Sequence, residues 1–401
     1  MTASAPQPNS QSAADSPRVV ARIFALTDVG QSREHNEDTF LVADLDSALP
    51  IAFDSGVREL PVLTHGLLFL VADGMGGAAS GEIASSMAGL TVLDVLREHW
   101  LPAAMPGAED FAAALRDATT AANTRIHGFA RDNPEHRGMG TTATIAGIFG
   151  DTVYVSQVGD SRAYLVRDGV ARQLTKDQSL MQRLVEAGEL TQEQAEASDR
   201  RNIILQALGP ESHVTIDLTH QQVRRGDVLI LCSDGLSGLV RTDEIARIAT
   251  ESTDMRTVCE RLVTRANELG GPDNITVIAA TFDGDALHDS REGDRHGYYT
   301  FPIAGTLNQD AVAEATVPSS PPLKAHLRSD PTPRYGTPAP TSAALEEEFA
   351  RARAAEEQTA LGAPEAVVEE RRRKVEPLYF FLAAVAVAAL LWVLVSIFGK
   401  K

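Results

Sequence analysis

Residues 67–77 have the sequence LLFLVADGMGG, in which an apolar run ends at an aspartate followed by glycines. The run Leu67–Ala72 has the length and composition of a buried β-strand. A carboxylate at the end of such a strand suits a hard divalent cation, because adjacent glycines let backbone carbonyls approach closely. The stretch therefore predicts a core strand that presents Asp73 to a cation.

Acidic residues lie beside apolar runs at three more places in the first 280 residues. Thr152–Val158 precedes Asp160, Val228–Cys232 precedes Asp234, and Asp273-Asn274 precedes Ile275–Thr281. A fifth acidic stretch, Asn36-Glu37-Asp38, stands nearer the N-terminus. An isolated Asp-Gly pair is usually a turn, and an Asn-Glu-Asp triplet is usually a solvated loop. Taken together and in this order, the five stretches indicate a cluster of carboxylates that binds Mg²⁺ or Mn²⁺.

Arg33 stands three residues before Asn36, close enough to share a pocket with Glu37 and Asp38. A guanidinium group can hold a phosphate through two hydrogen bonds. The alternative is a solvated surface arginine.

The pattern of strands and helices from about Ala21 to Phe282 predicts an α+β fold. Strands follow one another through tight glycine-containing connections such as Phe149-Gly150-Asp151 and Arg167-Asp168-Gly169, which is typical of antiparallel hairpins. The predicted helices are Gly81–His99, Glu109–Asp132, Gln178–Ala187, Thr242–Thr250 and Met255–Leu269. The predicted strands are Arg22–Thr27, Thr39–Ala43, Leu67–Ala72, Thr141–Phe149, Thr152–Val158, Ala163–Arg167, Val214–Leu218, Val228–Cys232 and Thr276–Thr281. This order favours two antiparallel sheets with helices outside over a doubly wound parallel sheet.

Bulk composition limits the classes of partner. The 401-residue chain has a formal net charge of −19, which argues against nucleic acid as the main partner because phosphate backbones are bound by Lys and Arg. Cys232 and Cys259 are the only cysteines, and we expect both to be buried and reduced. Residues 1–20 are expected to be disordered, and they lack the features of a secretory signal, so the bulk of the chain is expected in the cytoplasm.

The C-terminal quarter predicts a linker followed by a membrane segment. Residues 284–376 are rich in Pro, Ser and Ala, which favours an extended linker. Leu378–Phe398 contains 21 residues without a charge, enough for a helix of roughly 30 Å, the thickness of a bilayer core. The basic cluster Arg371–Lys374 would stay in the cytoplasm. A buried core helix is the alternative, but we expect a transmembrane helix at 377–398 that anchors the protein by its tail, single-pass, in the cell membrane.

In order and spacing, the motifs of residues 21–283 resemble those of the metal-dependent Ser/Thr protein phosphatases of the 2C family, in particular the bacterial branch. The matching motifs are Gly30…Arg33…Asn36-Glu37-Asp38, Asp73-Gly74-Met75-Gly76-Gly77, Gly140-Thr141-Thr142, Gly159-Asp160-Ser161-Arg162, Ser233-Asp234-Gly235-Leu236 and Asp273-Asn274-Ile275-Thr276. The resemblance implies a four-layer α-β-β-α sandwich of two antiparallel sheets flanked by helices.

The resemblance also implies a centre with two Mn²⁺ or Mg²⁺ ions. Asp73 would bridge the two ions, and Glu37 with the Gly74 carbonyl would complete the protein ligands of one of them. Asp234 and Asp273 would hold the other ion. Attack by a metal-activated water would then need no protein nucleophile.

Three further roles follow from the same resemblance. Asp38 would orient metal-bound waters, Arg33 would hold the substrate phosphate, and Asp160 would share a third, weaker metal site with Asp234. The partners implied are Ser/Thr-phosphorylated proteins, among them a cognate Ser/Thr kinase. Two alternatives are a catalytically weak phosphoprotein-binding scaffold and a phosphatase dedicated to one small regulatory partner.

The sequence departs from the family pattern in two regions. Met75 stands where animal members carry a histidine, so another group must protonate the leaving oxygen. Thr175–Gly209 matches the flap subdomain of bacterial members, but Gln178 and Ser198-Asp199 replace histidine-containing patterns. These changes concern the flap more than the metal ligands.

Overall fold

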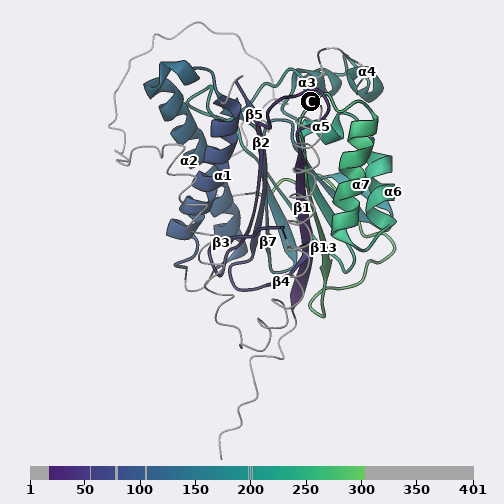
Figure 1. Ribbon diagram of the computed structural model, residues 1–401. Helices are drawn as coiled ribbons and strands as arrows, with labels where there is room; N and C mark the ends of the chain where they lie inside the picture. Colours follow the sequence, from purple (N-terminus) through teal and green to yellow (C-terminus); the bar gives the residue numbers. More distant parts are fainter. Residues whose placement is uncertain are drawn as a thin grey trace, which may run out of the picture. The chain divides into compact units, whose positions relative to one another are not determined.

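The computed structural model describes residues 18–302, apart from 55, 77–79, 104, 105, 197, 199 and 201. Two β-sheets pack face to face and two helices cover the outer face of each (Figure 1). One outer layer consists of α1 (Ser80–His99) and α2 (Ala108–Asp132), and the other of α6 (Thr242–Thr250) and α7 (Met255–Glu268). The predicted α+β sandwich of two antiparallel sheets with helices outside is therefore confirmed.

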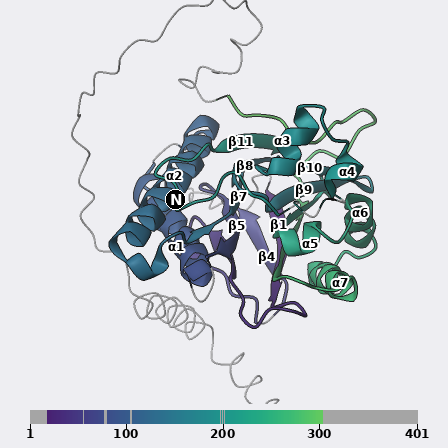
Figure 2. The same ribbon diagram turned by 90° about the horizontal axis from the view of Figure 1, so that it is seen from above.

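All strand pairs in the two sheets are antiparallel within the described chain. The six-stranded sheet has the order β10 (Val170–Gln173), β9 (Arg162–Arg167), β12 (Val228–Cys232), β13 (Ile275–Asp283), β1 (Val19–Asp28) and β4 (Arg58–Val62). The seven-stranded sheet has the order β11 (Asp217–Gln222), β8 (Thr152–Val158), β7 (Ala143–Phe149), β5 (Leu67–Met75), β2 (Asp38–Asp44) and β3 (Leu49–Pro50), with β6 (Gly140–Thr141) paired beside β5. Figure 2 shows the sandwich from above, with the helices outside both sheets.

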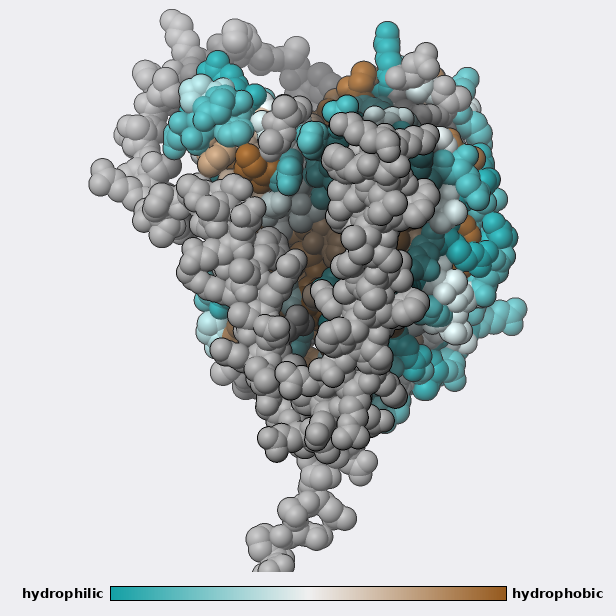
Figure 3. All heavy atoms as spheres, viewed as in Figure 1, coloured by the Kyte–Doolittle hydropathy of each residue, from teal (hydrophilic) through white to brown (hydrophobic). Residues whose placement is uncertain are grey.

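Three apolar layers hold the sandwich together. Between the sheets, Ile23, Phe69 and Phe282 are fully buried. Between the seven-stranded sheet and its covering helices, Trp100 packs against Phe111 of α2, with ring centroids 5.0 Å apart. The third apolar layer lies between the six-stranded sheet and α6 with α7. Successive residues of a strand face opposite sides, and both sides are covered here. The central strand β5 is therefore apolar without interruption from Leu67 to Ala72. The outward face of α6 and α7 is mostly hydrophilic (Figure 3).

The predicted helices and strands are largely confirmed, and the errors lie at the sheet edges. The strand expected at Val214–Leu218 is instead β11, because Asp217–Gln222 pairs with β8. Its sequence, DLTHQQ, is polar, since β11 is the last strand of its sheet and has only β8 as a full partner. The edge strand β4, which contains Pro61, was not predicted, nor was β10.

The predicted start of the linker at Gly284 is wrong. Gly284–Pro302, which we call the C-terminal strap, lies against the sandwich. Leu287 is buried, and Arg224 Nε donates to Asp294 at 2.8 Å. Phe301 N donates to the Leu218 carbonyl at 2.8 Å. The strap was missed because its partners are distant in sequence and its own composition is polar.

Two other predicted segments fall outside the described residues. These are the transmembrane helix at 377–398 and the rest of the linker, 303–376. Among the described residues, no helix has the length and hydropathy needed to cross a membrane. The N-terminus predicted to be disordered, residues 1–20, lies outside the described residues as far as residue 17, and its last two residues belong to β1, which begins at Val19.

We predict that a fragment of residues 18–302 is more stable than one of residues 18–283. The shorter fragment loses the buried Leu287 and the ring contacts of Phe301, so its free energy of unfolding should fall by about 3 kcal/mol. Urea denaturation of the two fragments measures the difference, with Phe301→Ala in the longer fragment as an intermediate control. Equal midpoints and slopes would show that the strap adds no stability.

Candidate metal centre and active site

The pairing of β2 with β5 places two of the predicted acidic residues side by side. Asp38 is the first residue of β2 and lies opposite Asp73 of β5 in the antiparallel register. Both carboxylates therefore stand at one end of the seven-stranded sheet. The sequence analysis placed Asp73 at a strand end, but the pairing with Asp38 emerges only from the register.

The six-stranded sheet contributes the other acidic residues. Asp234 begins α5 (Asp234–Ser237) just after β12, and Asp273 precedes β13, which is paired with β12. Asp160 lies in the connection between β8 of one sheet and β9 of the other. Asp73 interacts electrostatically with Asp38, Asp160, Asp234 and Asp273. The structure therefore brings together the five aspartates that the sequence singled out.

Four carboxyl groups of this cluster, those of Asp38, Asp73, Asp160 and Asp234, have raised pKa values. Burial, and then repulsion from Asp234 and Asp273, raises the pKa of Asp38 to about 7. Burial, with repulsion from Asp234, raises the pKa of Asp160 to about 8. The pKa values of Asp73 and Asp234 are also raised, first by removal from water and then by neighbouring carboxylates. Several like charges within a few ångströms are costly unless cations separate them.

Three carboxylate oxygens of the cluster have no hydrogen-bond partner in the described part of the chain and could bind hydrated cations. Asp38 Oδ1, Asp160 Oδ1 and Asp234 Oδ1 are buried and have no hydrogen-bond partner. Buried acceptors without a partner are rare and point to a missing ion or water. Among the described residues, no three His, Cys, Asp or Glu side chains converge on a single point as a closed metal cage. Mg²⁺, which usually keeps several waters, needs only one or two carboxylates, so an open carboxylate cluster suits it.

Glu37 and Gly74 lie on the same side of the cluster. Gly74 N donates to the Glu37 carbonyl at 3.1 Å. A Cβ atom at Gly74 would lie 2.5 Å from that carbonyl oxygen and 2.2 Å from the carbonyl oxygen of Gly81, so only glycine fits. At Gly81, near the start of α1, a Cβ atom would lie 2.7 Å from Glu37 Oε1. The two predicted ligands are therefore held together by glycines on both β5 and α1.

Arg33 lies at the exposed rim of the cluster. Its Nη2 is 2.9 Å from Asp273 Oδ2, and its Nη1 is 4.0 Å from Glu37 Oε2. The side chain is 47% exposed, so one side of the guanidinium is open to an incoming anion. This agrees with the expected position for a phosphate-binding arginine and excludes a surface arginine remote from the acidic cluster.

The sequence analysis quoted Ser233 and Thr276 within motifs but assigned them no role. Both hydroxyls donate to Asp38 Oδ2 at 2.7 Å, which leaves Oδ1 directed elsewhere without a partner. For Ser233, its position directly beside Asp234 was the available signal, whereas Thr276 stands three residues after Asp273 and offered none.

Asn274 also has a supporting role that the sequence analysis did not assign. Its Oδ1 accepts from Glu37 N at 2.8 Å, and its Nδ2 donates to the carbonyls of Val29 and His35, both at 2.9 Å. The side chain is buried. Asn274 therefore ties the loop that carries Arg33 and Glu37 to the start of β13.

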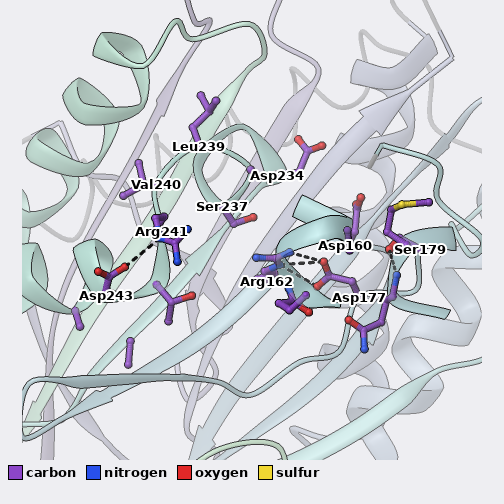
Figure 4. A pocket seen from close by; sticks show the side chains of 18 of the residues that line it. Asp160, Arg162, Asp177, Ser179, Asp234, Ser237, Leu239, Val240, Arg241 and Asp243 are labelled. Atoms are coloured by element: carbon purple, nitrogen blue, oxygen red, sulfur yellow. Dashed lines mark hydrogen bonds and ion pairs between the residues drawn. The ribbon is translucent and has the colours of Figure 1, made fainter. Parts of the chain in front are cut away.

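A cavity of about 570 Å³ opens beside the cluster and is lined by Asp160 and Asp234. Most of the rest of its lining comes from the predicted flap, which contains α3 (Leu180–Glu186) and α4 (Gln192–Glu196), and from residues between 237 and 246. Arg162 donates to both carboxylate oxygens of Asp177 at the cavity wall, as Figure 4 shows. The acidic cluster, the flap and residues 237–246 thus all contribute to the lining of the cavity.

One departure in the flap has a structural explanation. Gln178 Oε1 accepts from Gly159 N at 3.0 Å, and its Nε2 donates to the Thr215 carbonyl at 3.0 Å. Gln178 therefore joins the start of the flap to the Asp160 loop by neutral hydrogen bonds. The second departure in the flap is Ser198-Asp199, and Asp199 lies outside the described residues.

Comparison with known proteins identifies the family. Residues 59–270 match the model of protein phosphatase 2C. The chain is 36% identical over 257 residues to the serine/threonine phosphatase stp of Listeria monocytogenes, covering 64% of this chain and 94% of the relative. It is 35% identical over 261 residues to the protein phosphatase PhpP of Streptococcus pneumoniae, covering 65% and 97% of the two chains. The chain belongs to the protein phosphatase 2C family.

A solved structure agrees with this assignment. The serine/threonine phosphatase PstP/Ppp of Mycobacterium tuberculosis is 35% identical, with a TM-score of 0.55, and the match covers 66% of this chain and 99% of that one. The catalytic domain of PstP has also been solved in complex with two manganese ions, again at 35% identity and with a TM-score of 0.53. A fold with this degree of similarity therefore holds two manganese ions in another member of the family.

We predict that Thr276→Val lowers the Mn²⁺-dependent hydrolysis of an aryl phosphate by about 10- to 100-fold. Valine keeps the volume but removes one of the two hydroxyl donors to Asp38, and a hydrogen bond to a charged group contributes about 1.5–3 kcal/mol. Steady-state kinetics measure the loss, and Thr276→Ser, which keeps the hydroxyl, should stay within a few-fold of the unsubstituted protein. If valine and serine have the same effect, the hydroxyl does not position Asp38.

Proposed function

We propose that the acidic cluster is the catalytic centre at which this chain hydrolyses phosphoserine and phosphothreonine on proteins. As a member of the protein phosphatase 2C family, the chain is a protein serine/threonine phosphatase that depends on Mn²⁺ or Mg²⁺. The observation that carries the proposal is the convergence of Asp38, Asp73, Asp160, Asp234 and Asp273, with three buried carboxylate oxygens left unpaired.

The residues that would hold the two ions divide between the sheets. Glu37, Asp73 and the Gly74 carbonyl come from the β2 and β5 side, and Asp234 with Asp273 from the β12 and β13 side. When bound, such ions lower the pKa of a shared water and neutralise charge that develops on the transferred phosphoryl group. A third, weaker site would lie between Asp160 and Asp234, because repulsion between their carboxylates helps to raise the pKa of Asp160.

The remaining residues orient the reactants. Asp38, fixed through Oδ2 by Ser233 and Thr276, presents Oδ1 to a water as a hydrogen-bond acceptor. Arg33 holds the substrate phosphate at the rim, at the cost of weakening its contact with Asp273. We assign the protonation of the leaving oxygen to a water, because Met75 has no transferable proton.

The substrates proposed are Ser/Thr-phosphorylated proteins, including a cognate Ser/Thr kinase. The five predicted aspartates are present and lie together, which favours an active enzyme over a phosphoprotein-binding scaffold. No observation favours restriction to a single small regulatory partner.

The direct test is release of phosphate from a phosphothreonine peptide by the full-length protein with Mn²⁺ and with a chelator. Asp234→Asn is the matched control, because it keeps shape and hydrogen-bonding capacity but removes one charge. Hydrolysis that needs Mn²⁺ and disappears in Asp234→Asn supports the proposal. Full activity in the variant at limiting Mn²⁺ rules out Asp234 as a metal ligand.

Arg33→Ala should lower kcat/KM for the peptide by about one to two orders of magnitude. The loss corresponds to one charge-assisted contact with phosphate, about 1.5–3 kcal/mol. Mn²⁺ affinity, measured by calorimetry, should barely change, because arginine carries no metal ligand. A variant that loses Mn²⁺ instead would show that Arg33 holds Asp273 in place and does not bind the substrate.

We also propose that residues 377–398 anchor the protein in the cell membrane with the catalytic domain in the cytoplasm. The support is the 21 uncharged residues of Leu378–Phe398 after the basic Arg371–Lys374. A flexible tether from residue 303 to 376 would reach about 50 Å by random-coil scaling and would raise the local concentration of enzyme near membrane-bound substrates.

Truncation after residue 376 should release a soluble enzyme with unchanged activity on a small phosphate ester. Its efficiency should fall chiefly on membrane-bound phosphoproteins, because the tether no longer concentrates it there. Membrane fractionation and kinetics on both substrates measure this. Recovery of the full-length protein with the soluble fraction would disprove the anchor.

A further inference from the structure

The C-terminal strap bridges the edges of the two sheets. His296 Nε2 lies 2.9 Å from the carbonyl of Val170, in the edge strand β10. Gly297 N donates to Gln221 Oε1 at 3.1 Å, and Thr300 forms an antiparallel bridge with Thr219, both in the edge strand β11. Figure 2 shows the strap as the yellow-green trace that passes β11. This segment therefore joins the two sheets on the side where the flap begins.

Between these anchor points the strap places an aromatic ring at the base of the flap. Lys176 Nζ lies 4.9 Å from the centroid of the Tyr298 ring. The same ammonium group lies 3.2 Å from Glu186 Oε1, on the last residue of α3. Asp217, in β11, also attracts Lys176. Lys176 is thus surrounded by a ring from the strap, a carboxylate from α3 and a carboxylate from the sheet edge.

Helix α3 depends on such contacts at its ends. It has seven residues, of which only Met181 is buried. At its start, Ser179 Oγ accepts from Gln182 N at 3.3 Å, and Leu180 N donates to the Ile203 carbonyl at 2.9 Å. At its end, Glu186 Oε1 accepts from Gln182 Nε2 of the same helix at 3.1 Å, and the ion pair with Lys176 ties this end to residues outside the helix. A helix this short is marginal in isolation, so tertiary contacts determine its position.

The position of α3 matters because its residues line the cavity beside the acidic cluster. Met181 and Gln182 line that cavity from the flap, together with Asp160 and Asp234. A phosphoprotein whose phosphate lies at the cluster would extend neighbouring residues over this wall. An aryl phosphate is too small to depend on it.

We propose that Tyr298 is a positioning residue for protein substrates, which acts through Lys176 and Glu186 on α3. The Tyr298 ring restricts the Lys176 ammonium group by a cation–π contact, and this ammonium group fixes Glu186 at the end of α3. The position of α3 in turn determines the part of the cavity lining that contacts the substrate chain. The strap thereby belongs to the substrate-recognition apparatus as well as to the fold. This inference rests on the proposed function.

Full-length Tyr298→Ala, Tyr298→Phe and Tyr299→Ala test it. Phenylalanine keeps the ring, and Tyr299 is the adjacent, exposed strap residue, so it is the matched control. With Mn²⁺, Tyr298→Ala should raise KM for a phosphothreonine peptide about two- to five-fold, the strength expected of an exposed cation–π contact. Aryl phosphate kinetics should be unchanged, and the other two variants should match the unsubstituted protein.

A second measurement does not require activity. Hydrogen exchange of the amides of residues 180–186 should quicken in Tyr298→Ala but not in Tyr298→Phe or Tyr299→Ala. Lys176→Met removes both the ring contact and the ion pair with Glu186, so it should quicken exchange at least as much. Adding Tyr298→Ala to it should produce little more, because the ring acts through Lys176.

The outcomes separate the two proposals. Absence of Mn²⁺-dependent hydrolysis in the unsubstituted protein would refute the proposed function, whatever the exchange data show. Hydrolysis with equal peptide KM and equal exchange in Tyr298→Ala and Tyr299→Ala would overturn the role of Tyr298. Equal losses on peptide and aryl phosphate would also overturn it, because they would indicate a general structural defect.

Discussion

Repulsion among carboxylates held at one end of a β-sandwich is the constraint on which this structure depends. Burial and mutual repulsion raise the pKa of Asp38 to about 7 and that of Asp160 to about 8, and they also raise those of Asp73 and Asp234. A folded chain keeps such a cluster only because the surrounding scaffold is rigid and cations can neutralise it. This carboxylate cluster is supported by the two sheets, by their covering helices and by the hydroxyl groups that donate to Asp38.

The support comes from backbone pairing and from a few polar side chains. The β2–β5 register sets Asp38 against Asp73, and the β12–β13 pairing brings Asp234 towards Asp273. Ser233 and Thr276 then fix one oxygen of Asp38, while Asn274 holds the loop of Glu37. Asp38 and Glu37 are thus held by residues that belong to the opposite sheet or adjoin its strands, which gives the precision that a pre-organised site requires.

The sequence predicted the features that are local and missed those that depend on distant partners. Asp73 and Asp234 could be placed at strand ends because an apolar run precedes each of them. The role of Thr276 could not be inferred, since its hydrogen bond to Asp38 joins residues 238 positions apart. The same reason explains the strap: Asp294 and Phe301 stand in a polar stretch, and their partners Arg224 and Tyr154 lie on other elements. The polar edge strand β11 was misplaced because sheet edges lack the apolar signal of central strands.

Thermal unfolding as a function of pH, with Mn²⁺ and with a chelator, tests the central claim most directly. Asp38 and Asp160 have usual pKa values near 3.8 when unfolded and values of about 7 and about 8 when folded, so the folded state binds more protons between these limits. Their contribution to stability is complete below the unfolded pKa and is lost as the pH rises through the folded pKa. The metal-free protein should therefore melt at a lower temperature at about pH 8 than at about pH 5.5, and Asp38→Asn should reduce this difference. Mn²⁺ should restore stability far more at the higher pH, where it does not compete with protons. A melting temperature that rises with pH without metal, together with no effect of Mn²⁺ at pH 8, would contradict the account.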